Sequence, residues 1–154
     1  MRHLEPVRII LDVNVIVSAL ISQKGAPYLI LEKIIEDNSN IKLVMSREIF
    51  VELHGVLSYP SVKKYIRKDK KEVDEIINDI ELISELHGTS GYNCDRKSRD
   101  ADDDKYLLLA EAAKPDFIVS GDSDLTDLLS VGNVRIISPR AFWVFIEGSS
   151  LQNN

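Results

Sequence analysis

Four acidic residues occupy positions where a folded chain would bury a carboxylate partly or wholly. Asp12 and Asp122 follow short apolar runs, whereas Glu52 and Asp103 lie beside the apolar faces of predicted helices. A buried carboxylate is costly to keep charged, and four of them close together would repel one another strongly. A hard divalent cation such as Mg²⁺ or Mn²⁺ neutralises an all-oxygen cluster of this kind. If the fold brings the four together, the residues predict a metal-dependent enzyme that acts on phosphates.

Each acid has a plainer explanation when it is taken alone. An Asp after a strand commonly caps the next helix or turn, and a helical acid beside an apolar stripe usually lies at its solvated border. Glu52 lies three residues after Ile49 and four before Val56, and Asp103 lies three residues before Tyr106. Both acids are therefore on or beside the inward face. The hypothesis depends on all four positions coinciding in one small chain.

Three further polar residues are weaker candidates. Asp124 could be an additional metal ligand, but it could equally N-cap a helix over residues 125–129. Asn14 and Ser120 could orient a carboxylate or a water molecule, and Asn14 could instead N-cap a helix over residues 15–21. The three histidines and the one cysteine show no metal-ligand spacing, so a zinc site is not expected. The other acids around Asp103 are expected to form a solvated helix start.

Short apolar strands alternate with helices along the chain, which predicts an α/β fold with a mainly parallel sheet. In such sheets ligands bind beyond the carboxyl ends of the strands, where Asp12 and Asp122 would lie. The predicted strands are Val7–Leu11, Ile41–Met45, Phe117–Val119 and Val134–Ile137. The predicted helices cover residues 15–21, 27–36, 47–57, 62–67, 71–86, 102–113, 125–129 and 140–146, with a loop over 87–99.

The length of 154 residues predicts a single domain, with bounds 1–147 and a disordered tail over 148–154. A lone cysteine, Cys94, excludes an internal disulfide and fits a reducing cytoplasm. The first residues do not resemble a signal peptide, and no apolar run is long enough to span a bilayer, so no membrane association is expected.

The net charge of −6 argues against an indiscriminate nucleic-acid binder, but it allows a local basic strip. The dense basic stretch contains Lys63, Lys64, Arg67 and Lys68, which would form either a solvated helix face or a phosphate-binding strip. Arg99, just before the acidic helix, is a separate candidate for contact with a scissile-strand phosphate.

The sequence resembles the PIN domain family, in particular the branch of toxin components of toxin–antitoxin systems. The resemblance runs from Arg8 to about Pro139. Its motifs are the sequence of residues 8–15 with 17–20, Gly25-Ala26-Pro27, residues 46–57 with Glu52-Leu53, residues 99–103 leading into Tyr106-Leu107 and Ala110, and residues 118–125. The chain departs from the family pattern at Val13, where Thr or Ser is common, at Ala101, where Pro is frequent, and at Ser120, which replaces a frequent Thr.

The resemblance implies a three-layer fold and an endoribonuclease dependent on Mg²⁺ or Mn²⁺, with one or two ions. It assigns the acidic roles to Asp12, Glu52, Asp103 and Asp122, with Asp124 as a fifth candidate. It also implies RNA as substrate and a cognate antitoxin as partner, and it leaves a homodimer open. Nothing in the residues themselves separates RNA from DNA.

Other functions fit the sequence less well. A haloacid-dehalogenase-like phosphatase needs a second acid two residues after the first, where this chain has Asn14. A signalling receiver domain needs a Lys at the end of a later strand, but Ile118–Ser120 leads into another acid. A catalytically silent PIN-fold interaction module remains the main alternative, and only activity assays separate it from a nuclease.

Overall fold

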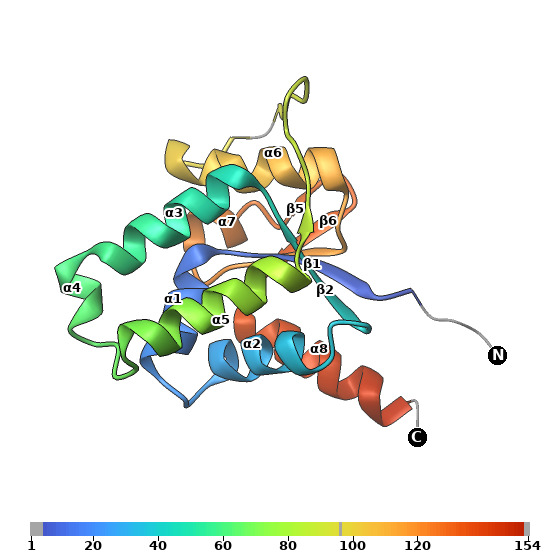
Figure 1. Cartoon of the computed structure of the whole chain (residues 1–154). Helices are drawn as coiled ribbons and strands as arrows, with labels where there is room; N and C mark the ends of the chain where they lie inside the picture. Colours follow the sequence, from blue (N-terminus) through green and yellow to red (C-terminus); the bar gives the residue numbers. More distant parts are fainter. Residues whose placement is uncertain (1–4, 96, 153–154) are drawn as a thin grey trace.

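The computed structural model describes residues 5–95 and 97–152, which form alternating strands and helices (Figure 1). The elements are β1 (Val7–Leu11), α1 (Val13–Ile21), α2 (Ala26–Glu36), β2 (Ile41–Met45), α3 (Arg47–Ser58), α4 (Pro60–Lys63), α5 (Lys70–Ile83), β3 (Glu85–Leu86), a 3-10 turn (Ala101–Asp103), α6 (Asp104–Ala113), β4 (Phe117–Val119), α7 (Ser123–Thr126), β5 (Ser130–Val131), β6 (Val134–Ile137) and α8 (Pro139–Gln152). The predicted α/β class is confirmed.

The sheet has the strand order β3-β2-β1-β4-β6-β5, and only the β5–β6 pair is antiparallel. Leu11 at the end of β1 is in register with Val119 at the end of β4, and the backbone N–H of Asp12 continues this ladder to the carbonyl of Val119 at 3.0 Å. The central strands are short and apolar because both faces are covered. The residues that follow β1 and β4 therefore emerge side by side at one edge of the sheet.

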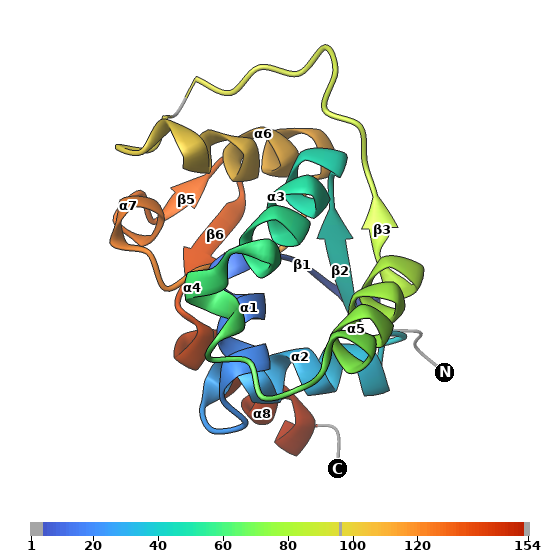
Figure 2. The same ribbon diagram turned by 60° about the vertical axis from the view of Figure 1, so that its left-hand side comes forward.

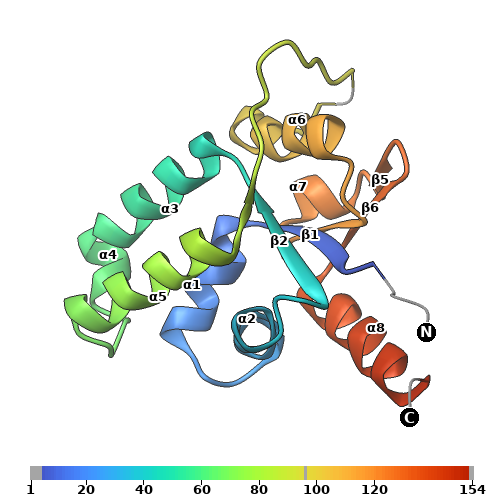
Figure 3. The same cartoon turned by 45° about the vertical axis from the view of Figure 1, so that its right-hand side comes forward.

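Helices cover both faces of the sheet. Helix α6 lies on one side, and α2 and α8 lie together on the other (Figures 1 and 3). The segment after β3 runs past α6, so that α6 begins close to α7 (Figure 2). The hydroxyl of Ser98 donates to the carbonyl of Asp124 at 3.2 Å, which ties the two regions together. Within the described residues, every helix is too short or too polar to cross a membrane.

Two short edge strands were not predicted, and the reason is visible at β3. Helix α5 was predicted to reach Leu86 because its apolar spacing continues that far, but it ends at Ile83, and Ser84 has an extended backbone. Glu85 and Leu86 then pair with β2, and Leu86 is 59% exposed. A strand of two residues has too little pattern to be recognised in a sequence, and β5 was missed for the same reason.

The predicted helix caps are wrong in two places. Asn14 was predicted to cap α1, but the carboxylate of Asp12 accepts from the backbone N–H of Asn14 and α1 begins at Val13. Asp124 was predicted to cap the helix after β4, but Asp122 caps α7 by accepting from the N–H of Asp124 at 2.9 Å. In both cases the aspartate two residues before the predicted cap is the cap.

Several helix bounds also differ from the predictions. Helix α4 covers Pro60–Lys63 rather than 62–67, because Pro60 starts it. The helix predicted over 102–113 begins as the 3-10 turn, and the one predicted over 125–129 ends at Thr126. Helix α8 continues through Gln152, so residues 148–152, predicted to be disordered, are helical, while 153–154 lie outside the described residues.

Candidate active site

Asp12 is buried at the end of β1 and is held by three hydrogen-bond donors. Its Oδ1 accepts from the backbone N–H of Asn14 at 3.0 Å and from the hydroxyl of Tyr106 at 3.2 Å. Its Oδ2 accepts from the hydroxyl of Ser120 at 2.7 Å. Asp12 is only 2% exposed. Charge on a buried carboxylate is tolerated when donors of this kind surround it, so this side chain is fixed in orientation.

Tyr106 connects Asp12 to Glu52. Its hydroxyl accepts from the N–H of Val13 at 3.0 Å, and Oε2 of Glu52 lies 3.5 Å away on α3. The ring is fully buried, and burial together with the negative charge of Asp12 raises the pKa of Tyr106 above its ordinary value. The hydroxyl therefore keeps its one proton, which it can donate either to Asp12 or to Glu52.

Asp103 and Asp122 form the second half of the acidic group. Burial raises the pKa of Asp103 to about 7, together with hydrogen bonding to Asp122 and the negative charges of Asp122, Asp12 and Asp100. Asp103 is 9% exposed, and its Oδ2 is buried without a hydrogen-bond partner within the described part of the chain. A native buried polar atom without a partner calls for an explanation, and an oxygen of this kind fits a role as a cation ligand.

Asp100, Asp103 and Asp124 each offer an oxygen, and these three oxygens lie within 4.8 Å of one another. Asp124, predicted as a fifth ligand, is thus near Asp103. Asp100 was assigned in the sequence to a solvated helix start. It is exposed and caps the 3-10 turn, but it also faces this group. The spacing Asp100-x-x-Asp103 on one helical turn was the signal that could have revealed it.

The four predicted acids are linked in pairs: Tyr106 contacts Asp12, after β1, and Glu52, on α3, while Asp103, at the end of the 3-10 turn, interacts with Asp122 and with the charge of Asp12. Of these four, only Asp103 belongs to the group of oxygens within 4.8 Å of one another, whose other members are Asp100 and Asp124. Ser120 links Asp12 and Asp122, since its hydroxyl contacts Asp12 and accepts from the N–H of Asp122 at 3.0 Å. Asn14 contributes its backbone N–H to Asp12, whereas its side chain is exposed.

Two cations contact the acidic residues. The ammonium of Lys105, on the first turn of α6, forms an ion pair with Glu52, and sequence reasoning missed it. Arg99, predicted to touch a phosphate, pairs with Asp124 at 3.0 Å and with Asp127 at 2.6 Å. A lysine on the polar side of an amphipathic helix carries no sequence signal, which is why Lys105 was overlooked.

The predicted basic strip lies on α4 and the segment that follows it. Lys63, Lys64 and Arg67 are exposed, and Lys68 is half-buried and 4.0 Å from Glu72. A cavity of about 430 Å³ adjoins them, with Leu57 and Ile77 among its lining residues. No ion pair or hydrogen bond among the described residues joins this strip to the acidic group.

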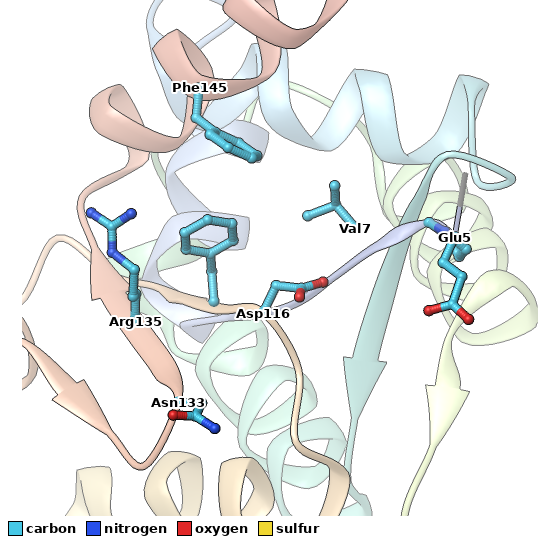
Figure 4. A pocket seen from close by; sticks show the side chains of 8 residues that line it. Glu5, Val7, Asp116, Asn133, Arg135 and Phe145 are labelled. Atoms are coloured by element: carbon cyan, nitrogen blue, oxygen red, sulfur yellow. The ribbon is translucent and has the colours of Figure 1, made fainter. Parts of the chain in front are cut away.

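A second cavity, of about 410 Å³, lies at the other edge of the sheet (Figure 4). Val7, Phe117 and Arg135 line it from the starts of β1, β4 and β6. Because these strands are parallel, their starts lie opposite the edge that carries Asp12 and Asp122. This cavity is therefore separate from the acidic group.

Comparison with known proteins identifies the family. A model of the PIN domain matches residues 8–124. The chain belongs to the PIN domain family. A curated relative of this PIN domain, the uncharacterized protein MJ1680 of Methanocaldococcus jannaschii, is 28% identical over 140 residues, which cover 86% of each chain.

A solved structure shares the fold of this PIN domain. A chain of the VapBC2 structure from Rickettsia felis, bound to a DNA fragment from its promoter, is 17% identical and has a TM-score of 0.53. The match covers 85% of the present chain and 98% of the other. The PIN domain of RRP44 from T. brucei is 14% identical with a TM-score of 0.46, and the match covers 97% and 86% of the two chains.

Proposed function

We propose that this PIN domain is a cytoplasmic endoribonuclease that depends on Mg²⁺ or Mn²⁺ and serves as the toxin of a toxin–antitoxin pair. PIN domains are generally nucleases, which supports hydrolysis of phosphodiester bonds. The observation that carries the metal dependence is the buried oxygen of Asp103, which has no partner among the described groups and lies in a group of carboxylates. An all-oxygen donor set of this kind fits a hard divalent cation.

Asp12, Glu52, Asp103 and Asp122 are the residues that would hold one or two ions, with Asp124 and Asp100 as further ligands. When bound, a divalent ion would supply positive charge against the phosphate oxygens and would acidify an attacking water. The chain prepares this chemistry through hydrogen bonds. Ser120 and Tyr106 fix the two oxygens of Asp12, and outer contacts of this kind orient ligands and tune a metal site.

The protonation of Asp103 sets the net charge of the acidic residues in the metal-free protein. Because its pKa is raised to about 7, it holds a proton over part of the neutral range in the metal-free protein. That proton must leave before the carboxylate can bind a cation, since metal ligands bind in the deprotonated form. Cation binding is therefore expected to release a proton and to strengthen as pH rises.

RNA would reach the acidic group along positive side chains. We assign Lys63, Lys64, Arg67 and Lys68 to sequence-independent contacts with backbone phosphates, which suits their exposure. Arg99 is placed next to the acids, but its guanidinium already contacts Asp124 and Asp127. It would act on a phosphate only after leaving one of these partners.

The antitoxin partner is proposed from the family branch that the sequence resembles. The Rickettsia felis protein of similar fold is itself described as VapBC2, a pair bound to promoter DNA. Co-expression with the product of a neighbouring small reading frame should yield a stable complex that no longer cleaves RNA. The free chain's mass in solution, measured by light scattering, then separates a monomer from the homodimer that the family leaves open.

The decisive experiment is cleavage of defined RNAs with Mn²⁺, with Mg²⁺ and with excess chelator. Asp12→Asn should reduce turnover by orders of magnitude, while Asp79→Asn, at an exposed acid on α5, should leave it unchanged. Undiminished cleavage in chelator would exclude metal dependence. A well-folded protein that binds Mn²⁺ but cleaves no RNA or DNA would favour the interaction module.

A further inference from the structure

The ion pair between Lys105 and Glu52 joins two helices at the acidic group. The ammonium of Lys105, on α6, contacts Oε2 of Glu52, on α3. The same nitrogen donates to the carbonyl of Asp102 at 2.7 Å and lies 5.3 Å from the ring centre of Tyr106. The Lys105 side chain is 22% exposed, so part of it still faces solvent.

This pair differs from the other lysine pairs of the described chain. Lys33 and Asp37 at 3.7 Å, like Lys68 and Glu72, are four residues apart on the surface of one segment, where an ion pair contributes little. Lys105 instead places a positive charge on a carboxylate that the proposed function assigns to a divalent cation. An ammonium and a divalent ion on one carboxylate repel each other, so binding of the two is mutually weakening.

A second observation concerns the substrate. An RNA phosphate that approaches this edge of the sheet meets several carboxylates, which repel it. The cations that contact these carboxylates are Lys105 and Arg99 within the described residues. The Arg99 guanidinium already has Asp124, Asp127 and the carbonyl of Ser123 as partners. Lys105 has a flexible stem and a compact charge, and lysine is a common phosphate ligand.

We propose that Lys105 is a further functional residue with two positions of its ammonium. Without a divalent cation it neutralises Glu52, and with a cation on Glu52 it turns to the RNA phosphate next to the bond that is cut. This inference rests on the proposed function, because it requires Glu52 to be a cation ligand. It makes Lys105 a competitor of the ion in the free protein and a substrate ligand in the loaded one.

The two roles predict opposite changes in one variant. Lys105→Met should bind Mn²⁺ several-fold more tightly in the absence of RNA, as measured by titration calorimetry, because the competing charge on Glu52 is gone. The same variant should cleave RNA at least tenfold more slowly at saturating Mn²⁺. Lys105→Gln should behave in the same way, and Lys33→Met, which removes an ammonium from the Lys33–Asp37 pair, should change neither quantity.

The alternative is a purely structural ion pair that holds Glu52 in place. In that case Lys105→Met and Lys105→Gln would bind Mn²⁺ more weakly than the wild type or equally well, and either result overturns the inference. Failure of the proposed function is distinguishable, since wild type and Glu52→Gln would then bind Mn²⁺ equally or not at all. If Glu52→Gln weakens Mn²⁺ binding and the Lys105 variants do not strengthen it, only the role of Lys105 is refuted.

Discussion

The hydroxyl of Ser120 donates a 2.7 Å hydrogen bond to Oδ2 of Asp12, across the ends of two neighbouring strands. Oγ of Ser120 also accepts from the backbone N–H of Asp122, so one buried hydroxyl contacts both aspartates at this edge. The two residues lie 108 positions apart in the chain. The geometry of the acidic group thus depends on the pairing of β1 with β4.

Ser120→Ala is expected to lower both stability and activity. It leaves Oδ2 of Asp12 and the N–H of Asp122 without their hydroxyl partner, which costs about 1–3 kcal/mol for a buried polar group. Loss of a contact that orients a metal ligand typically reduces metal affinity or activity by about 10–100-fold. Urea unfolding and RNA cleavage measure the two effects. Ser39→Ala removes an exposed hydroxyl that donates to Asp37, and it should change neither stability nor cleavage appreciably.

Tyr106→Phe tests the link between Asp12 and Glu52. Without the hydroxyl, the buried N–H of Val13 loses its acceptor and both acids lose a donor, so we expect a loss of about 1–3 kcal/mol in the free energy of unfolding. Mn²⁺ affinity should fall as well, because both carboxylates become less ordered. Tyr28→Phe, which removes a hydroxyl beside Glu32, is the matched control. A destabilised variant with unchanged Mn²⁺ affinity would limit Tyr106 to a structural role.

The raised pKa of Asp103 predicts an unusual dependence of stability on pH in the metal-free protein. The folded state holds this proton up to about pH 7, while the unfolded chain releases it near 3.8, so the folded state binds more protons in between. Stability contributed by this group is therefore lost as pH rises from about 4 to about 7. Asp37 and Glu85 have lowered pKa values, so their contributions change only below about pH 4.5, close to ordinary carboxyl values.

Asp103→Asn should remove that loss. At pH 8 in chelator, its melting temperature should exceed that of the wild type by about 2–4 °C for each kcal/mol of relieved repulsion. At pH 4 the two proteins should melt together, and Asp79→Asn should follow the wild type at both values. The prediction fails if Asp103→Asn melts at or below the wild-type temperature at pH 8.

Proton release also predicts the pH dependence of cation binding. At sub-saturating Mn²⁺, the cleavage rate should climb between about pH 5 and pH 8, and saturating Mn²⁺ should move the lower part of this curve to more acidic pH. Both follow from competition between protons and metal at the acidic group. A pH–rate profile that is the same at both Mn²⁺ concentrations would show that this competition does not control the reaction.

The basic strip leads to a prediction that does not depend on the metal site. If Lys63 and Lys64 contact RNA phosphates, the double change to Gln should weaken RNA binding at all sequences and reduce the salt slope by about one unit per lost contact. Turnover at saturating RNA should stay the same. The double change at Lys24 and Lys114, two exposed lysines elsewhere, is the control. Equal salt slopes in the wild type and both double variants would show that the strip is an ordinary solvated surface.

The sequence predicted the core strands and the acidic group for one physical reason. Residues that follow a buried strand lie at the carboxyl edge of a parallel sheet: Asp12 comes directly after β1, and Asp122 comes three residues after the end of β4. Glu52 and Asp103 were proposed from helical periodicity; Glu52 lies on α3, and Asp103 lies in the 3-10 turn just before α6. The local sequence pattern was therefore enough to predict a side chain's position wherever that position is set by its own helix or strand.

The missed features depend on contacts between elements. The pairing of Lys105 with Glu52 needs the relative placement of α6 and α3, which no local pattern encodes. Strand β3 exists because Glu85 and Leu86 meet the edge of β2, although their spacing continues the helix before them. The cap of α1 was assigned two residues late because Asn and Asp are nearly equivalent as caps, and the fold decides between them.

The pairing of β1 with β4 has a consequence for the making of the protein. A growing chain that ends before Phe117 contains Asp12 and Glu52 but has no β4, no Ser120 and no Asp122. Contacts between such distant segments also form slowly, because a long loop must close first. If the protein cuts RNA, a nascent chain cannot attack its own message before the codons of β4 and Asp122 have been read. The order of the strands alone would thus delay the first cleavage until after translation of β4.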